Sequence, residues 1–163
     1  MADLLAEWTD FHVAIVGATA ALAGLVIVAA SVNISVIVKS RTLTARLGSG
    51  IVMLVLALAV SAVALMPRIT DAWFGAVMLG LAMAALILQI STARLLAKDP
   101  DPLDQKRWAK ALIGFLPPTA YIVASALLLV DQPTAMFVSA CGALIAIVAA
   151  LVVSWVALVE VLR

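Results

Sequence analysis

The uncharged run at residues 11–38 is the feature that most limits what this chain can fold into. As a helix rising about 1.5 Å per residue, it is about 42 Å long, more than the roughly 30 Å hydrocarbon core of a bilayer. We therefore expect it to span a membrane. The composition agrees, because 12% of the residues are charged, whereas about a quarter are charged in soluble domains.

Four further uncharged runs divide the chain into five predicted membrane spans. The second run ends at Pro67, which terminates a helix. Only residues 68–71 separate it from the third run, so these two spans are predicted to form an antiparallel hairpin. The predicted spans are residues 11–38, 47–67, 72–93, 111–130 and 134–159, with a polar loop at residues 94–110. The sequence thus predicts one all-α transmembrane bundle over residues 1–163.

The basic residues predict the orientation of this bundle. The chain has 10 Lys and Arg residues, and in the five-span arrangement all except Arg68 fall on one side. The positive-inside rule then places the N-terminus outside and the C-terminus in the cytoplasm. The tryptophans agree, since Trp8 and Trp73 fall at the outer interface and Trp108 and Trp155 at the inner one.

Small residues share one narrow face of the first predicted helix at 100° per residue. These residues are Gly17, Ala21, Gly24, Ser31 and Ser35. His12, Thr19 and Asn33 gather near the opposite face. Lipid requires neither feature, so we expect the first helix to be central and to contact protein on two sides, through close packing of the small residues. Whether the partner is in the same chain or in a neighbouring copy stays open.

Further small-residue stripes in the second and fifth spans are candidate partners for that face. They are Gly50, Ala57, Ser61 and Ala64 in the second span and Ser139, Gly142, Ala146 and Ala149 in the fifth. Small residues are common in membrane helices in any case, which is the alternative explanation.

A candidate polar layer lies in the cytoplasmic half of the spans, counted inward from the boundary charges. Its members are Asn33, Gln89, Pro117, Pro118, Thr119 and Ser154. The two prolines withdraw backbone donors from the carbonyls of Ile113 and Gly114, which need other partners in a bilayer. The layer is either a set of interhelical hydrogen bonds, each contributing about 1 kcal/mol or less, or the lining of a small polar cavity beside a kinked fourth helix.

Two other groups of polar residues have a functional and an ordinary interpretation. Lys98, Lys106, Arg107 and Lys110 are candidate contacts for anionic lipid headgroups or an acidic partner, and they also set the topology. His12 is either a pH sensor or metal ligand in an oligomer, or an interfacial residue bonded to headgroups and water.

The chain offers little material for catalysis. It has one His and one Cys, and no acid or base lies in the middle of a span, so we predict no catalytic residue, no metal site and no cofactor. The LGSG segment at residues 47–50 lacks the lysine and the strand of a phosphate-binding loop. We therefore expect a protein that is not an enzyme.

The segment at residues 8–34, WTDFHVAIVGATAALAGLVIVAASVNI, resembles the N-terminal segment of a broad group of small bacterial multi-pass membrane proteins with no established activity. The positions that carry the resemblance are Trp8, Asp10, Phe11, Gly17, Ala18, Ala20, Ala21, Leu22, Gly24, Leu25, Ser31 and Asn33. The resemblance implies a bacterial cytoplasmic (inner) membrane and no particular chemistry.

These features predict a structural or regulatory membrane subunit that acts through helix packing and oligomerisation. Its expected partners are the lipid bilayer and either further copies of the chain or a larger membrane complex, and no nucleic acid. The alternative is a small channel, transporter or lipid-binding module that uses the polar layer in the cytoplasmic leaflet.

Overall fold

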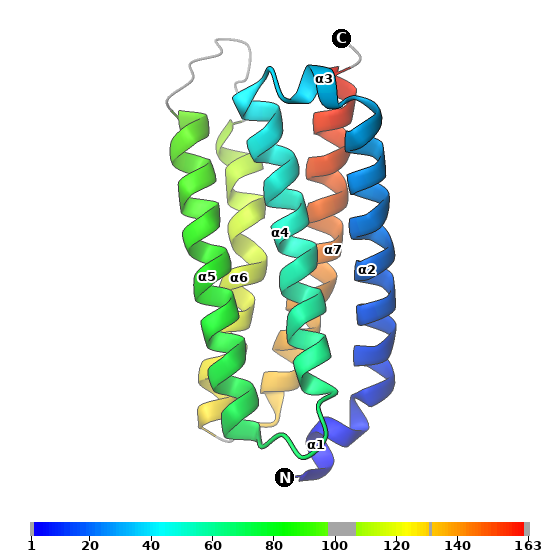
Figure 1. Cartoon of the computed structure of the whole chain (residues 1–163). Coiled ribbons are helices and arrows are strands. Elements are labelled where there is room, and N and C mark those ends of the chain that lie inside the picture. The colour runs from blue at the N-terminus through cyan, green and yellow to red at the C-terminus, as the bar shows by residue number, and fades with distance from the viewer. Residues whose placement is uncertain (1, 98–106, 131, 162–163) are drawn as a thin grey trace.

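The computed structural model describes residues 2–97, 107–130 and 132–161, and every element in these ranges is a helix, which confirms the predicted all-α class. The helices are α1 (Ala2–Glu7), α2 (Thr9–Val32), α3 (Ile34–Ile37), α4 (Arg41–Ala64), α5 (Asp71–Ala97), α6 (Arg107–Leu129) and α7 (Thr134–Val161). The long helices lie side by side, and α1 and the C-terminal end of α7 lie at opposite ends of the bundle (Figure 1).

Four of the described helices are long and apolar enough to cross a membrane: α2, α4, α5 and the part of α7 at Thr134–Val156. The described apolar part of α6, Ile113–Leu129, is shorter. Several such helices side by side indicate a multi-pass membrane protein. Pro117 and Pro118 lie inside α6, and the helix continues through both of them.

Within one chain, α4 and not the first long helix is the centre of the bundle. α4 packs against α2, α5 and α7, and contacts α6 less extensively. In the most apolar stretch of α4, 56% of the residues are buried, against 17% in α2. α2 therefore lies at the edge of a four-helix unit made of α4, α5, α6 and α7 (Figure 1). The expectation of a central first helix is wrong for the single chain.

Small residues bring the helices of the four-helix unit close together. A Cβ added at Gly50 of α4 would lie 3.0 Å from Ser154 Oγ and 3.5 Å from the Ala150 carbonyl oxygen of α7. A Cβ at Gly142 of α7 would lie 3.2 Å from the Cβ of Ala120 in α6. Gly50 and Gly142 are thus packed at close helix approaches inside this unit, and the other small residues predicted as stripes in the second and fifth spans are buried.

The first uncharged run is not one continuous helix. α2 ends at Val32, and Asn33 has non-helical backbone angles (φ −111°, ψ 21°) with its N–H bonded back to carbonyls of the preceding turn. The short helix α3 follows, and Ser40 then caps α4 by accepting a hydrogen bond from the Leu43 N–H. The tight turn and the cap redirect the chain, so α3 lies across the end of the bundle instead of extending α2 (Figure 1).

Candidate functional site

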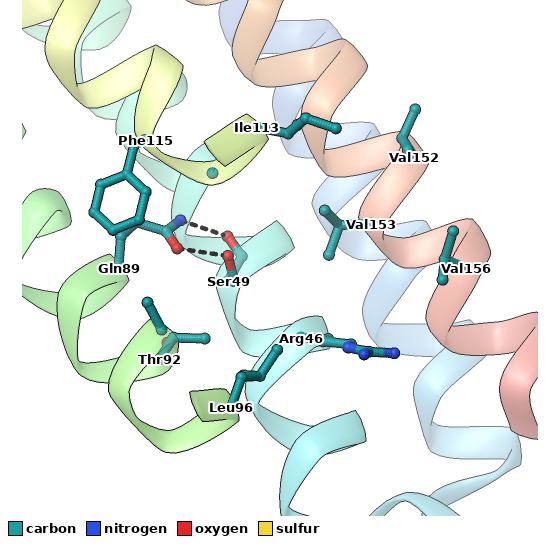
Figure 2. A pocket seen from close by; sticks show the side chains of 12 residues that line it. Arg46, Ser49, Gln89, Thr92, Leu96, Ile113, Phe115, Val152, Val153 and Val156 are labelled. Atoms are coloured by element: carbon teal, nitrogen blue, oxygen red, sulfur yellow. Dashed lines mark hydrogen bonds between the residues drawn. The ribbon is translucent and has the colours of Figure 1, made fainter. Parts of the chain in front are cut away.

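A cavity of about 60 Å³ lies inside the four-helix unit, near the end where α4 begins and α5 and α7 end. At roughly 10–15 Å³ per water molecule, it has room for several waters or a small polar group. Spaces between the helices of a bundle are common ligand sites. The lining residues are Arg46, Ser49, Gln89, Thr92, Ala93, Leu96, Ile113, Gly114, Phe115, Val152, Val153 and Val156 (Figure 2).

A buried amide forms part of the cavity wall and links α5 to α4. Gln89 is 4% exposed, and its Oε1 accepts a hydrogen bond of 2.7 Å from Ser49 Oγ. Its Nε2 donates to the Ser49 carbonyl oxygen at 3.5 Å. Figure 2 shows both bonds at the edge of the cavity. These partners allow two polar side chains to be buried in an apolar bundle.

On the α6 side, Gly114 lies against this amide. A Cβ at this position would lie 3.1 Å from Gln89 Oε1, so the glycine leaves the room that the amide occupies. The Gly114 carbonyl would accept from the N–H of residue 118 in an α-helix or of residue 117 in a 3₁₀ turn. Both are prolines, which have no N–H. This carbonyl therefore needs a donor from a side chain, water or ligand.

The polar wall continues toward the end of the bundle. Arg46 lies one turn before Ser49 on α4, and Thr92 lies one turn after Gln89 on α5, and both line the cavity. Figure 2 shows Arg46 reaching from α4 toward the side formed by α7. α6 and α7 supply apolar residues to the lining: Ile113, Phe115, Val152, Val153 and Val156. A cavity with one polar and one apolar wall suits an amphiphilic ligand.

Ser154, a member of the predicted polar layer, lies next to the cavity residue Val153 without itself being part of the lining. It is 3% exposed, and its Oγ has no hydrogen-bond partner within the described chain. It lies at the close approach of α7 to Gly50. Of the predicted layer, only Gln89 is among the residues that line the cavity.

The remaining members of the layer do not share one site. Thr119 is exposed, and its Oγ1 donates back to two carbonyls of its own preceding turn, at 2.9 Å each. Pro117 and Pro118 are buried. Asn33 is half-buried at the break between α2 and α3.

The residues predicted for helix packing on the first helix are all exposed. Gly17, Ala21, Gly24 and Ser31 lie on one face of α2, and Ser35 lies on α3, beyond the break at Asn33. Apart from the nearby backbone of α2 itself, no atom lies within 4 Å of a Cβ added at either glycine. The face that packs on the bundle is the other one, with His12, Ile15, Thr19 and Val26 buried. Within the described chain, the small face is therefore uncovered.

His12 is enclosed by aromatic residues instead of facing water. It is 2% exposed, and its ring meets those of Phe11 and Phe74 edge-on, with centroids 5.7 and 6.3 Å apart. Neither ring nitrogen has a hydrogen-bond partner in the part of the chain that the structure describes. In that same part, no group of three or more His, Cys, Asp or Glu residues is placed to hold a metal ion.

The predicted basic group falls mostly outside what the structure describes. Lys98 and Lys106 lie outside the described residues, and for Arg107 and Lys110 only the backbone of α6 is described. Their contact with anionic lipid stays a prediction.

Sequence reasoning missed Arg46, Ser49 and Thr92 as site residues. The available signal was helical spacing, since Thr92 follows Gln89 by three residues and Arg46 precedes Ser49 by three. Comparison of the chain with protein-family models, curated proteins and solved structures finds no match. The functional argument therefore depends on the geometry of the cavity.

Proposed function

We propose that this protein is a multi-pass membrane protein that binds a small amphiphilic ligand inside its bundle, near the cytoplasmic face. The hydrogen-bonded pair of Gln89 and Ser49 beside an open cavity is the observation that supports this most strongly. Burying an amide in an apolar bundle is costly unless it is hydrogen-bonded. A pair that only fixed the helices would need no open space beside it.

The proposal includes five spans, with the N-terminus outside. α6 is counted as a span because residues 111–130 carry no charge and because α6 runs beside α5 and α7. In this arrangement all Lys and Arg residues except Arg68 belong to the cavity end, which the positive-inside rule places in the cytoplasm. The resemblance at residues 8–34 favours a bacterial cytoplasmic membrane.

Ala93→Phe tests the proposal, because Ala93 is a half-buried lining residue on α5 where a phenyl ring fills the cavity. The full chain is stripped of lipid in detergent and mixed with phosphatidylethanolamine, phosphatidylglycerol and cardiolipin. Retained lipid is counted by native mass spectrometry. We expect Ala93→Phe to bind roughly tenfold more weakly than the wild type, a loss of about 1.4 kcal/mol.

Ala84→Phe is the matched control, because it places the same ring on an exposed position of α5 outside the cavity. It should retain lipid like the wild type. Equal retention by Ala93→Phe and the wild type would contradict binding in the cavity. Thermal unfolding in the same detergent shows whether each variant is folded. If Ala93→Phe is not folded, Ala93→Leu replaces it, and it should also bind lipid more weakly than the wild type.

A second function, a subunit that works by helix packing, is supported by the uncovered small face of α2. Gly17 and Gly24 both face open space. A glycine that faces lipid exposes its backbone and offers the lipid no side-chain contact. Glycines at such positions allow the backbone of another helix to approach closely. We propose a second copy of this chain as the occupant, and the mass of the particle after mild extraction measures it.

A further inference from the structure

The charge of the cavity wall indicates the chemical class of the ligand. Among the described residues that line the cavity, Arg46 is the one charged side chain, and none is Asp or Glu. A guanidinium stays protonated at physiological pH, is weakly hydrated and matches the geometry of phosphate and carboxylate. Arg46 already has another interaction in the structure, but a guanidinium has five N–H donors and can bind an anion as well, so the wall favours an anion over a cationic group.

The depth of Arg46 corresponds to that of lipid headgroups. α4 begins at Arg41, so Arg46 lies about 8 Å along the helix from its cytoplasmic end. Basic side chains at this depth keep their charge at the membrane interface while their aliphatic part stays in the apolar region. Thr92 adds a hydroxyl to the same polar wall.

The apolar wall distinguishes an amphiphile from a free anion. Val152 is 44% exposed and also lines the cavity, so the cavity reaches the outer surface of α7, which faces acyl chains in a membrane. We infer that the cavity binds the anionic headgroup of a membrane amphiphile, with Arg46 as the counter-ion and the acyl chain leaving past Val152. This inference rests on the proposed function, because it names the ligand class of the same cavity.

Arg46→Gln tests the inference, since it removes the charge and keeps a polar, although shorter, side chain. The lipid-stripped full chain in detergent is titrated separately with dioleoylphosphatidylglycerol, dioleoylphosphatidylcholine and inorganic phosphate. Native mass spectrometry measures the two lipids and calorimetry the phosphate. We expect the wild type to bind the anionic lipid roughly tenfold more tightly than the zwitterionic one, and Arg46→Gln to lose this preference.

Two further variants separate charge from fold. Arg46→Lys keeps the charge and should keep most of the preference. Arg41→Gln removes an exposed positive charge from the same helix outside the cavity, and should bind like the wild type. An unfolding temperature close to that of the wild type shows that Arg46→Gln is folded. If Arg46→Gln is not folded, the relative affinities of the wild type for the anionic and the zwitterionic lipid test the inference.

Equal binding of the two lipids by the wild type, or an unchanged preference in Arg46→Gln, overturns the inference. Inorganic phosphate binding as tightly as phosphatidylglycerol also overturns it, because the site then takes a soluble anion. If these results occur while Ala93→Phe still binds lipid more weakly than the wild type, the proposed cavity function stands and only the headgroup assignment fails. If Ala93→Phe retains lipid like the wild type, the proposed function fails, and the headgroup assignment fails with it.

Discussion

At the scale of single residues, the candidate site depends on a glycine, which has no side chain. Gly114 leaves the space into which the Gln89 amide fits, while Ser49 holds that amide from the other side. The position of Gln89 near the end of its helix could be predicted from the sequence by counting from the boundary charges. Its partner could not, because a hydrogen bond between α4 and α5 depends on how two helices are rotated toward each other.

Gly114→Ala should destabilise the fold by about 1 kcal/mol, since the new methyl group crowds an amide held by two hydrogen bonds. With Gln89→Ala in the same chain the crowding disappears, and the substitution at residue 114 should become neutral or stabilising because alanine favours a helix. Thermal unfolding in detergent measures the four chains of this double-mutant cycle.

Gly80→Ala provides the control, because no atom apart from the nearby backbone of α5 itself lies within 4 Å of a Cβ at that position. It should leave stability unchanged or slightly raised. If Gly114→Ala reduced stability equally with and without the Gln89 side chain, the amide would not be what the glycine accommodates.

At the scale of elements, α2 shows the limit of a helical wheel. The wheel correctly separated a small-residue face from a face with His12 and Thr19, but it could not tell which face the bundle covers. The covered face is that of His12 and Thr19. Which neighbour a helix has depends on the packing of all the others, so a single sequence does not determine it.

Gly24→Leu should reduce self-association of the extracted protein roughly tenfold, because a leucine at the centre of the small face holds a neighbouring helix away. Size-exclusion chromatography with light scattering measures the particle mass over a range of protein concentrations. Ala18→Leu adds the same side chain at another exposed position, about 120° around α2, and should not change the mass. An unaltered mass for Gly24→Leu would remove the packing proposal.

At the scale of the molecule, the lengths of the uncharged runs predicted where the long helices lie along the chain. They did not predict how the helices are arranged. Short connections make α4 and α5, and α6 and α7, neighbours in sequence and in space. The contact of α4 with α7 joins distant parts of the sequence through close approaches such as Gly50 to Ala150, and small residues are too common in membrane helices to identify such a pair in advance.

Gln132→Cys and Arg41→Cys, in a chain whose free, exposed Cys141 is replaced by serine, test the proposed topology. Both positions are exposed; Gln132 lies in the connection between α6 and α7, and Arg41 is the first residue of α4, at the other end of the bundle (Figure 1). In intact cells, a membrane-impermeant maleimide should label Gln132→Cys, and should label Arg41→Cys only after permeabilisation. Labelling of both from outside would contradict five spans with a cytoplasmic C-terminus.

The paired prolines of α6 have a consequence for hydration. However the helix tilts or shifts, neither Pro117 nor Pro118 acquires an N–H to offer the Gly114 carbonyl. A donor from outside the local backbone has to accompany this oxygen in every state of the protein. A ligand that enters the cavity beside Gly114 must therefore carry a hydrogen-bond donor for this oxygen, leave a water molecule in place, or leave the oxygen to a donor from a side chain.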